Sequence, residues 1–280
     1  MTLTLAATPL GNPGDASPRL KAAIESAEVI AAEDSRRFHR LASDLGVTFT
    51  AKIISFFDGN ETARTQEVLA RLQAGKRVLV VSDAGMPTIS DPGFRLMRDA
   101  IAEGIEVSVI PGPSAVIMSV ALSGLPTDRF SFEGFPPRTA GARIATFEKL
   151  RFEERTMVFF EAPHRLADSL VDAVTVFGAD RLGAICREMT KRYEETIRGN
   201  LGELSAWAST NEVLGEITLV IAGAATDSAS LTAADMVGRV REFEAAGMDR
   251  KSAIATVAEE FGIAKRLVYA AVVDANKMSQ

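Results

Sequence analysis

The feature that most constrains the fold is a buried strand followed by a long, turn-rich loop, within residues 77–93. The run Val78-Leu79-Val80-Val81 is unbroken, apolar and rich in β-branched residues, which is typical of a parallel strand buried on both faces. It ends at Ser82-Asp83-Ala84-Gly85, and two prolines and a glycine delay the next helix until Phe94. In open α/β sheets ligands bind at the carboxyl ends of strands, so this loop is a candidate binding segment.

Comparable loops follow three other predicted strands, at residues 8–15, 111–114 and 161–165. Each combines proline with glycine or polar side chains directly after an apolar run. One such loop would equally fit an ordinary connection from a strand to a helix. Four such loops favour a ligand site, because several strand ends that face one cleft would together form a binding site.

Strand and helix patterns alternate through the first 123 residues, which predicts a parallel sheet. The expected strands span residues 2–7, 28–32, 53–57, 78–81 and 106–110, and the expected helices span 17–26, 61–74, 94–103 and a segment ending at 123. Ser17 followed by Pro18 is a typical helix start. We therefore expect an N-terminal α/β domain over residues 1–123.

A second α/β domain is expected over residues 124–222, because Gly124-Leu125-Pro126-Thr127 interrupts the first pattern and a new alternation follows it. Its expected strands span residues 129–133, 156–160, 181–186, 194–198 and 216–221, with helices up to 150 and over 166–177 and 201–207. The loop at residues 134–141 is too polar and rich in proline for a core segment.

The end of the chain is predicted to form a small helical domain at residues 231–280, after a linker of small and polar residues at 223–230. Helices are expected over 232–246, 251–261 and 264–273, with Gly262 between the last two. These last two fit either a plain helical hairpin or a helix-turn-helix that carries Lys265 and Arg266.

Composition excludes several classes of protein. The 280 residues, 47% of them hydrophobic, can form a large core and favour more than one domain. A single cysteine, Cys186, excludes an internal disulfide, and no run approaches the length of a membrane helix, so we expect a cytoplasmic protein without a membrane partner. A net charge of −6 argues against non-specific coating of nucleic acid, although clustered arginines beside the loops would suit a folded RNA.

The loops do not match the common phosphate-binding or metal-binding patterns. No P-loop and no G-x-G-x-x-G follows a predicted strand, and His39 and His164 have no cysteines at ligand spacing, so no metal is expected. Loops of glycine, proline and small hydroxyls instead offer backbone N–H and C=O groups at close range. That surface suits an amphoteric ligand with a carboxylate, a nucleoside and a sulfonium cation.

The motifs in these loops resemble, in order, those of the ribosomal RNA small subunit methyltransferase I family, a branch of the tetrapyrrole methylases. They lie at residues 7–12 (ATPLGN), 32–36 (AEDSR), 81–87 (VSDAGMP), 89–93 (ISDPG), 111–115 (PGPSA), 123–128 (SGLPTD), 132–135 (FEGF), 161–165 (EAPHR) and 187–191 (REMTK). The resemblance extends over residues 1–273. The first loop, TPLGNPGD, replaces the glycine-rich loop of porphyrin and corrin methylases, which separates this chain from tetrapyrrole substrates.

The resemblance implies S-adenosylmethionine in a cleft between two α/β domains of a homodimer. It also implies 2′-O-methylation of a cytidine in the decoding centre of 16S rRNA in the small ribosomal subunit. The residues implied for cofactor binding are Pro9, Leu10, Asp83, Ala84, Gly85, Met86, Ser114, Ala115, Glu161, Glu188 and Ile217. Two other functions stay open: methylation of a tetrapyrrole, and a non-catalytic role in binding RNA or the ribosome.

Methyl transfer to a ribose hydroxyl is an in-line displacement in which a carboxylate could accept the proton. Glu188 and Glu161, at the ends of second-domain strands, are the candidates, followed by Glu33 and Asp34. The alternative for each is an ion pair with a neighbouring arginine. The residues expected to contact RNA phosphates are Arg36, Arg37, Arg138, Arg165 and Arg187.

Overall fold

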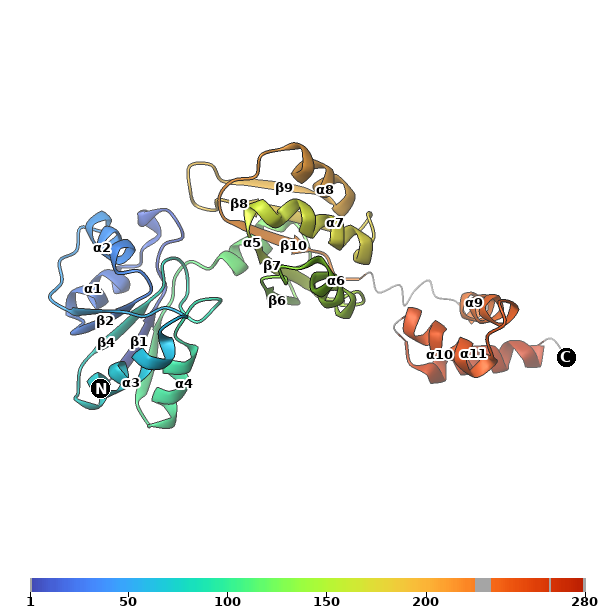
Figure 1. The fold of residues 1–280 in the computed structure, drawn as a ribbon, viewed down its shortest axis with the longest axis horizontal. Helices are drawn as coiled ribbons and strands as arrows, with labels where there is room; N and C mark the ends of the chain where they lie inside the picture. Colours follow the sequence, from blue (N-terminus) through green and yellow to red (C-terminus); the bar gives the residue numbers. More distant parts are fainter. Residues whose placement is uncertain (1, 225–232, 262, 279–280) are drawn as a thin grey trace. The chain divides into compact units, whose positions relative to one another are not determined.

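The computed structural model describes residues 2–224, 233–261 and 263–278 (Figure 1). The chain forms two compact units, one of residues 1–148 and 155–222 and the other of residues 149–154 and 223–280. Most of the predicted linker, residues 225–230, and the predicted separator Gly262 lie outside the described residues.

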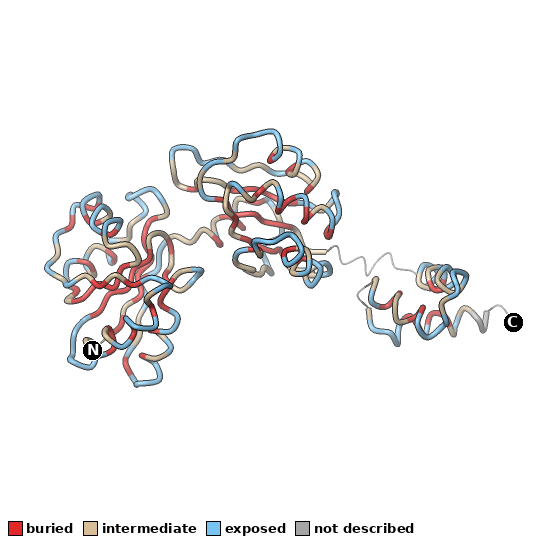
Figure 2. Tube along the Cα trace, viewed as in Figure 1, coloured by how far each residue is buried: buried red, intermediate tan, exposed pale blue. Residues whose placement is uncertain are grey.

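The first sheet is entirely parallel, as the alternating pattern predicted, with the order β3-β2-β4-β1-β5. The strands are β1 (Thr2–Ala6), β2 (Val29–Ala32), β3 (Lys52–Ser55), β4 (Val78–Val81) and β5 (Glu106–Ile110). All four residues of β4 are buried between its neighbours β2 and β1 (Figure 2). The loop that follows β4 therefore begins on a rigid central strand.

Helices cover both faces of this sheet. They are α1 (Pro18–Ser26), α2 (Ser35–Asp44), α3 (Glu61–Gln73) and α4 (Phe94–Ala102), with a short 3₁₀ helix η1 (Pro13–Asp15). On one face α3 and α4 pack against every second side chain of the strands, including Leu3 and Val78. On the other face α1 and α2 pack against the alternate side chains, including Leu79 and Val81.

Helix α2 was not predicted from the sequence, where its many charged residues obscured the apolar stripe. The Asp34 carboxylate accepts hydrogen bonds from the amides of Arg36 and Arg37 and so caps the helix. Phe38 and Ala42, four residues apart, form its buried face.

The second sheet is mixed, with the order β6-β7-β10-β8-β9. Its strands are β6 (Phe130–Gly134), β7 (Thr156–Glu161), β8 (Leu182–Arg187), β9 (Glu195–Asn200) and β10 (Ile217–Ile221). Only β6 and β7 pair in parallel, and the other three pairs are antiparallel. Because β10 runs opposite to β7 and β8, the start of β10 lies beside their carboxyl ends, with Ile217 opposite Glu161 and Arg187.

One face of the second sheet packs on α5 (Ala115–Ser123), whose Val116 and Val120 meet Val158 and Val220. The remaining helices are α6 (Ala140–Lys149), η2 (Pro163–Arg165), α7 (Leu166–Phe177) and α8 (Leu201–Thr210). A buried ion pair joins α6 to α7, with Arg143 Nη2 and Asp172 Oδ2 2.6 Å apart.

The second unit contains α9 (Ala233–Ala245), α10 (Arg250–Glu260) and α11 (Lys265–Met278). The three helices share a core of their own that includes Val240, Val257 and Val268. No helix in the described parts of the chain is long and apolar enough to cross a membrane.

Candidate functional site

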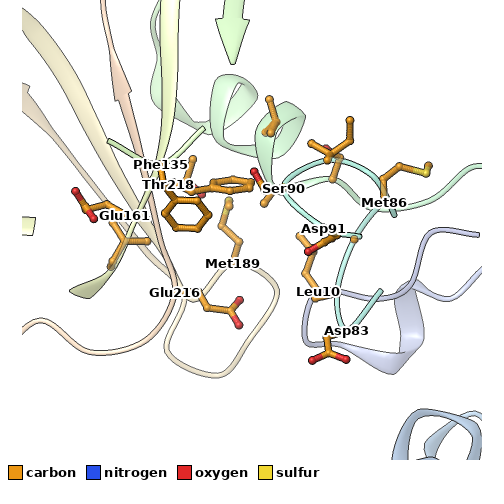
Figure 3. Close-up of a pocket in the computed structure, with 18 of the residues that line it drawn as sticks. Leu10, Asp83, Met86, Ser90, Asp91, Phe135, Glu161, Met189, Glu216 and Thr218 are labelled. Carbon is orange, nitrogen blue, oxygen red and sulfur yellow. The ribbon is translucent and has the colours of Figure 1, made fainter. Parts of the chain in front are cut away.

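A cavity of about 410 Å³ lies in the first unit, at the loops that follow β1, β4, β5 and β7 (Figure 3). Leu10, Gly85, Ser114 and Ala162 each represent one of these loops in its lining. The four loops that the sequence singled out therefore meet at one cavity. Its volume falls in the range of roughly 300–1,000 Å³ typical of small-molecule sites.

The loops after β1 and β4 are joined through their backbones. The amide of Thr8 donates to the carbonyl of Gly85 at 2.8 Å, and the amide of Gly85 donates back to Thr8 at 3.1 Å. Gly85 has a φ of +78°, and a Cβ there would lie 3.2 Å from Leu10 Cδ2. Glycine thus permits both the left-handed backbone and the close approach of the two loops.

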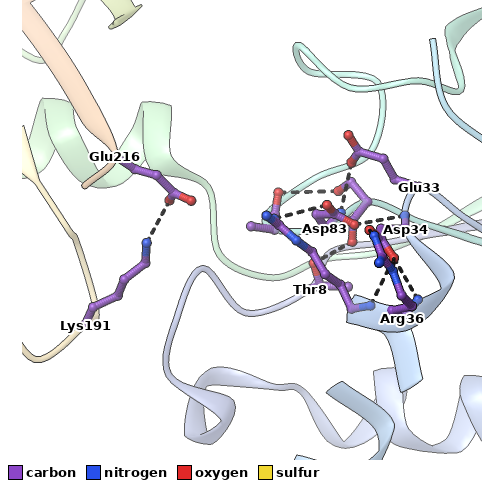
Figure 4. Close-up of polar contacts among 10 residues, drawn as sticks. Thr8, Glu33, Asp34, Arg36, Asp83, Lys191 and Glu216 are labelled. Carbon is purple, nitrogen blue, oxygen red and sulfur yellow. Dashed lines mark hydrogen bonds and ion pairs between the residues drawn. The ribbon is translucent and has the colours of Figure 1, made fainter. Parts of the chain in front are cut away.

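A network of carboxylates lies along the first-sheet side of the cavity (Figure 4). Glu33 Oε2 accepts a hydrogen bond from the amide of Asp83 at 3.1 Å, and Asp83 Oδ1 accepts one from the amide of Asp34 at 3.0 Å. Arg37 Nη1 lies 3.1 Å from Asp83 Oδ2. These bonds fix the end of β4 to the start of α2.

Asp91 adds a third acidic side chain to Glu33 and Asp83 in the cavity lining. Burial raises the pKa of Asp91 to about 7, with help from the charge of Glu33 and against a hydrogen bond from Ser82. Burial also raises the pKa of Glu33 and of Asp83. Closely spaced, partly desolvated carboxylates favour a bound cation.

Two hydrogen bonds and one ion pair fix Glu161 at the end of β7, and its side chain is fully buried. It accepts hydrogen bonds from Ser169 Oγ and from the amide of Ala162, and Arg165 Nε lies 3.4 Å from its Oε1. Arg165 Nη2 in turn donates to the carbonyls of Pro136 and Pro137, at 2.6 and 3.0 Å. The contacts that run from Glu161 through Arg165 to these two carbonyls therefore hold the loop after β6 in place.

Aromatic and sulfur-containing side chains form the second-sheet side of the cavity. Phe135, Phe160 and Met189 line it together with Thr218, which is buried. Figure 3 shows Phe135, Met189 and Thr218 on one side, opposite Asp91. Glu161 and Glu216 also line this side, so the cavity has carboxylates on both sides and its aromatic side chains on the second-sheet side.

Glu188 occupies a different position, just outside the cavity lining. Its Oε1 lies 2.9 Å from Lys191 Nζ and accepts a hydrogen bond from the amide of Glu216 at 2.9 Å. Burial alone would raise the pKa of Glu188, but the bonds from Lys191 and Glu216 outweigh it and lower that pKa. Lys191 also pairs with Glu216 (Figure 4) and leaves no room for a Cβ at Gly11.

Comparisons with known proteins agree with this geometry. The family model for tetrapyrrole (corrin/porphyrin) methylases matches residues 2–205. A ribosomal RNA small subunit methyltransferase I of Mycobacterium tuberculosis (strain ATCC 25618 / H37Rv) is 48% identical, over 98% of this chain and 95% of its own. The proteins of the same name from Synechocystis sp. and Escherichia coli O157:H7 are 41% and 36% identical, each over 95% of this chain and over 95% and 93% of their own lengths. The chain belongs to the ribosomal RNA small subunit methyltransferase I family.

Solved structures show that this methyltransferase has the tetrapyrrole methylase fold. The methyltransferase CobJ aligns with a TM-score of 0.61 at 18% identity, over 80% of this chain and 94% of its own. A uroporphyrin-III C-methyltransferase from Thermus thermophilus, complexed with S-adenyl homocysteine, aligns with a TM-score of 0.53 at 15% identity, over 79% and 96%. These identities support the shared fold alone.

The cofactor of the methyltransferase is S-adenosylmethionine, and the cavity fits it. The donor carries a net positive charge, which complements Glu33, Asp83 and Asp91, and its nucleoside needs an apolar wall such as the one that Phe160 and Met189 provide. Backbone groups of the joined loops around Gly85 lie at the same cavity. When bound, the donor supplies an electrophilic methyl group on a sulfonium sulfur.

Nine of the residues predicted to bind the cofactor line the cavity: Leu10, Asp83, Ala84, Gly85, Met86, Ser114, Ala115, Glu161 and Ile217. The other two do not. Pro9 is buried, and Glu188 forms an ion pair with Lys191 rather than with the neighbouring arginine of the alternative interpretation. Asp91 and Phe135 line the cavity without having been predicted, although both belong to motifs that the sequence contains, ISDPG and FEGF.

The five arginines predicted to contact RNA fall into two groups. Arg36, Arg37 and Arg138 are exposed, and Arg37 also lines the cavity. Arg165 and Arg187 have side chains only 16% and 19% exposed; Arg165 is bound to Glu161, and Arg187 Nη1 lies 3.0 Å from Glu195. Arg36 and Arg37 also pair with Asp34 and Asp83, but their side chains are 91% and 68% exposed, so the first three arginines are accessible to a macromolecule and the other two are mostly covered. Among the described residues no cluster of histidine, cysteine or carboxylate side chains is arranged to hold a metal.

Proposed function

We propose that this methyltransferase transfers a methyl group to the 2′-hydroxyl of a cytidine ribose in the decoding centre of 16S ribosomal RNA. The observation that carries the proposal is the 48% identity, over almost the full length of both chains, to a protein named ribosomal RNA small subunit methyltransferase I. The family resemblance extends the proposal to a cytoplasmic homodimer that acts on the small ribosomal subunit.

The cavity supports an in-line transfer, because most of the catalysis can come from alignment of the acceptor oxygen with the methyl carbon and sulfur. The joined loops around Thr8 and Gly85 provide rigid backbone on one side. The end of β7, fixed by the contacts of Glu161, provides a rigid edge on the other. Two rigid walls allow donor and acceptor to be held at a constant geometry.

The proton of the ribose hydroxyl needs an acceptor, and the two predicted carboxylates differ in their suitability. Glu188 has a lowered pKa and lies outside the cavity lining, so it is a weak base at a distance. Glu161 lines the cavity, but two hydrogen bonds and an ion pair with Arg165 already engage its carboxylate. Of the two we favour Glu161. Glu161→Gln should then lower kcat, whereas Glu188→Gln should leave kcat nearly unchanged.

Exposed arginines would position the RNA. Arg36, Arg37 and Arg138 offer bidentate guanidinium groups that suit phosphate oxygens. Such contacts would hold the register of the RNA without reading its sequence.

The test is a transfer assay with labelled S-adenosylmethionine on small subunits from a strain that lacks the gene for this protein. Mapping should find one new 2′-O-methylcytidine in 16S rRNA, and subunits from the parent strain should accept no label. Naked 16S rRNA, assembled subunits and uroporphyrinogen III are compared in parallel. Transfer to the tetrapyrrole alone, or binding of the donor without transfer to RNA, would contradict the proposal.

A further inference from the structure

We propose that Phe135 is the platform on which the target nucleobase stacks while its ribose enters the cavity. This inference rests on the proposed function, because it assumes that the acceptor is a nucleotide of RNA. It gives a binding role to Phe135, a residue whose part in the reaction the family name does not specify.

The Phe135 ring stands at the rim of the cavity with much of its surface open. It lines the cavity and is nevertheless 56% exposed. Phe160 packs against it at a ring-centroid distance of 5.6 Å and an interplanar angle of 63°. Phe160 is itself packed at 4.8 Å against Phe132 on the neighbouring strand. One side of the Phe135 ring is therefore supported, while more than half of its surface remains free for a planar ligand.

The backbone that carries this ring is held in place. Pro136 and Pro137 follow Phe135 directly and restrict the local φ angles. Their two carbonyls accept hydrogen bonds from Arg165 Nη2, and Arg165 is anchored to the buried Glu161. A ring held in this way loses little conformational freedom when a ligand stacks on it, which favours binding.

The position of the ring fits a nucleotide of RNA better than it fits the donor. A 2′-hydroxyl can enter a cavity only when its nucleotide leaves the stack of neighbouring bases, and the exposed base then needs a new stacking partner. Arg138, exposed and three residues further along the same loop, can bind the adjoining phosphate. Asp83 and Asp91, two of the carboxylates that suit the positive charge of the donor, lie on the other side of the cavity from Phe135 (Figure 3).

The first experiment compares Phe135→Ala with Phe94→Ala. Phe94 is a matched control, because it is also 56% exposed but does not line the cavity. For Phe135→Ala we expect the KM for small subunits to rise about tenfold, the size of one lost base–aromatic stack. Affinity for S-adenosylhomocysteine, measured by calorimetry, should stay within about twofold of the parent, and Phe94→Ala should change neither quantity.

The second experiment detects stacking directly and needs no turnover. Phe135→Trp is made in a Trp207→Phe background, so that the new indole is the sole tryptophan of the chain. Small subunits added in the presence of S-adenosylhomocysteine should quench its fluorescence, whereas S-adenosylhomocysteine alone should not.

The outcomes separate the inference from the function on which it rests. If the parent enzyme methylates subunits and Phe135→Ala loses affinity for S-adenosylhomocysteine but keeps its KM for subunits, the ring stacks on the donor and the inference is overturned. An unquenched indole would overturn it as well. If the parent binds S-adenosylhomocysteine but methylates no RNA, the proposed function itself fails, and the inference fails with it.

Discussion

Affinity for S-adenosylmethionine should rise as pH increases from 6 to 8, and Asp91→Asn should remove most of that rise. Burial raises the pKa of Asp91 from its ordinary value to about 7. Below pH 7 its carboxyl group is then mostly neutral, and above pH 7 it is mostly ionised. A cationic donor is bound more tightly by the ionised form, so affinity is gained as pH rises through 7 and lost as it falls.

The magnitude follows from that one pKa. If only the ionised form binds, the observed Kd scales as one plus the ratio of neutral to ionised carboxyl, which is about 11 at pH 6 and about 1.1 at pH 8. The Kd should therefore be about tenfold higher at pH 6, equivalent to about 1.4 kcal/mol. Glu33 and Asp83, whose pKa values are also raised, and the nearby Asp58 and Arg37 broaden the transition.

The assay is calorimetric titration with S-adenosylmethionine at pH 6, 7 and 8, on the parent, on Asp91→Asn and on Asp180→Asn. Asp180 is exposed and does not line the cavity, so its variant should keep the full slope. Asp91→Asn should bind the donor weakly, with a nearly constant Kd. A parent Kd that does not change over this range, or an unaltered slope in Asp91→Asn, would refute the reasoning.

Three further changes test other parts of the structure. Arg138→Ala should weaken RNA binding several-fold and reduce its salt slope by about one, without a change in donor affinity; equal RNA binding at low salt would remove Arg138 from the interface. Arg143→Met leaves Asp172 buried without its partner and should lower the free energy of urea unfolding by about 3–5 kcal/mol, whereas a loss below about 1 kcal/mol would contradict the assigned ion pair. Gly85→Ala and Gly46→Ala both place alanine at a positive φ, at a cost of about 1–2 kcal/mol each, but only at Gly85 does the new Cβ crowd a cavity residue. Calorimetry should therefore show weaker donor binding for Gly85→Ala alone, and equal binding by both variants would disprove the crowding.

The sequence predicted the strands well, because their apolar runs are local signals. Val78–Val81 and Glu106–Ile110 are strands with the expected ends, and helix Leu166–Phe177 also has its expected bounds. Helix Ser35–Asp44 was missed, since only Phe38 and Ala42 on its surface are buried. The antiparallel pairings of the second sheet could not be foreseen, because they depend on contacts between strands far apart in the chain.

The loops of the site were predictable and several of its side chains were not. A strand end followed by proline and glycine is visible in the sequence, and all four such loops line the cavity. Whether Asp91 points into it, or Glu188 turns instead to Lys191, depends on backbone angles and partners that tertiary structure determines. Phe135 has the same sequence signature as a core aromatic, and only its 56% exposure distinguishes it.

The cavity walls come from both sheets, so neither α/β half of the first unit holds a complete site. A ligand that contacts both walls adds its binding energy to the association of the two halves. Heating without donor should then allow the halves to melt separately, and saturation with donor should merge the two transitions into one.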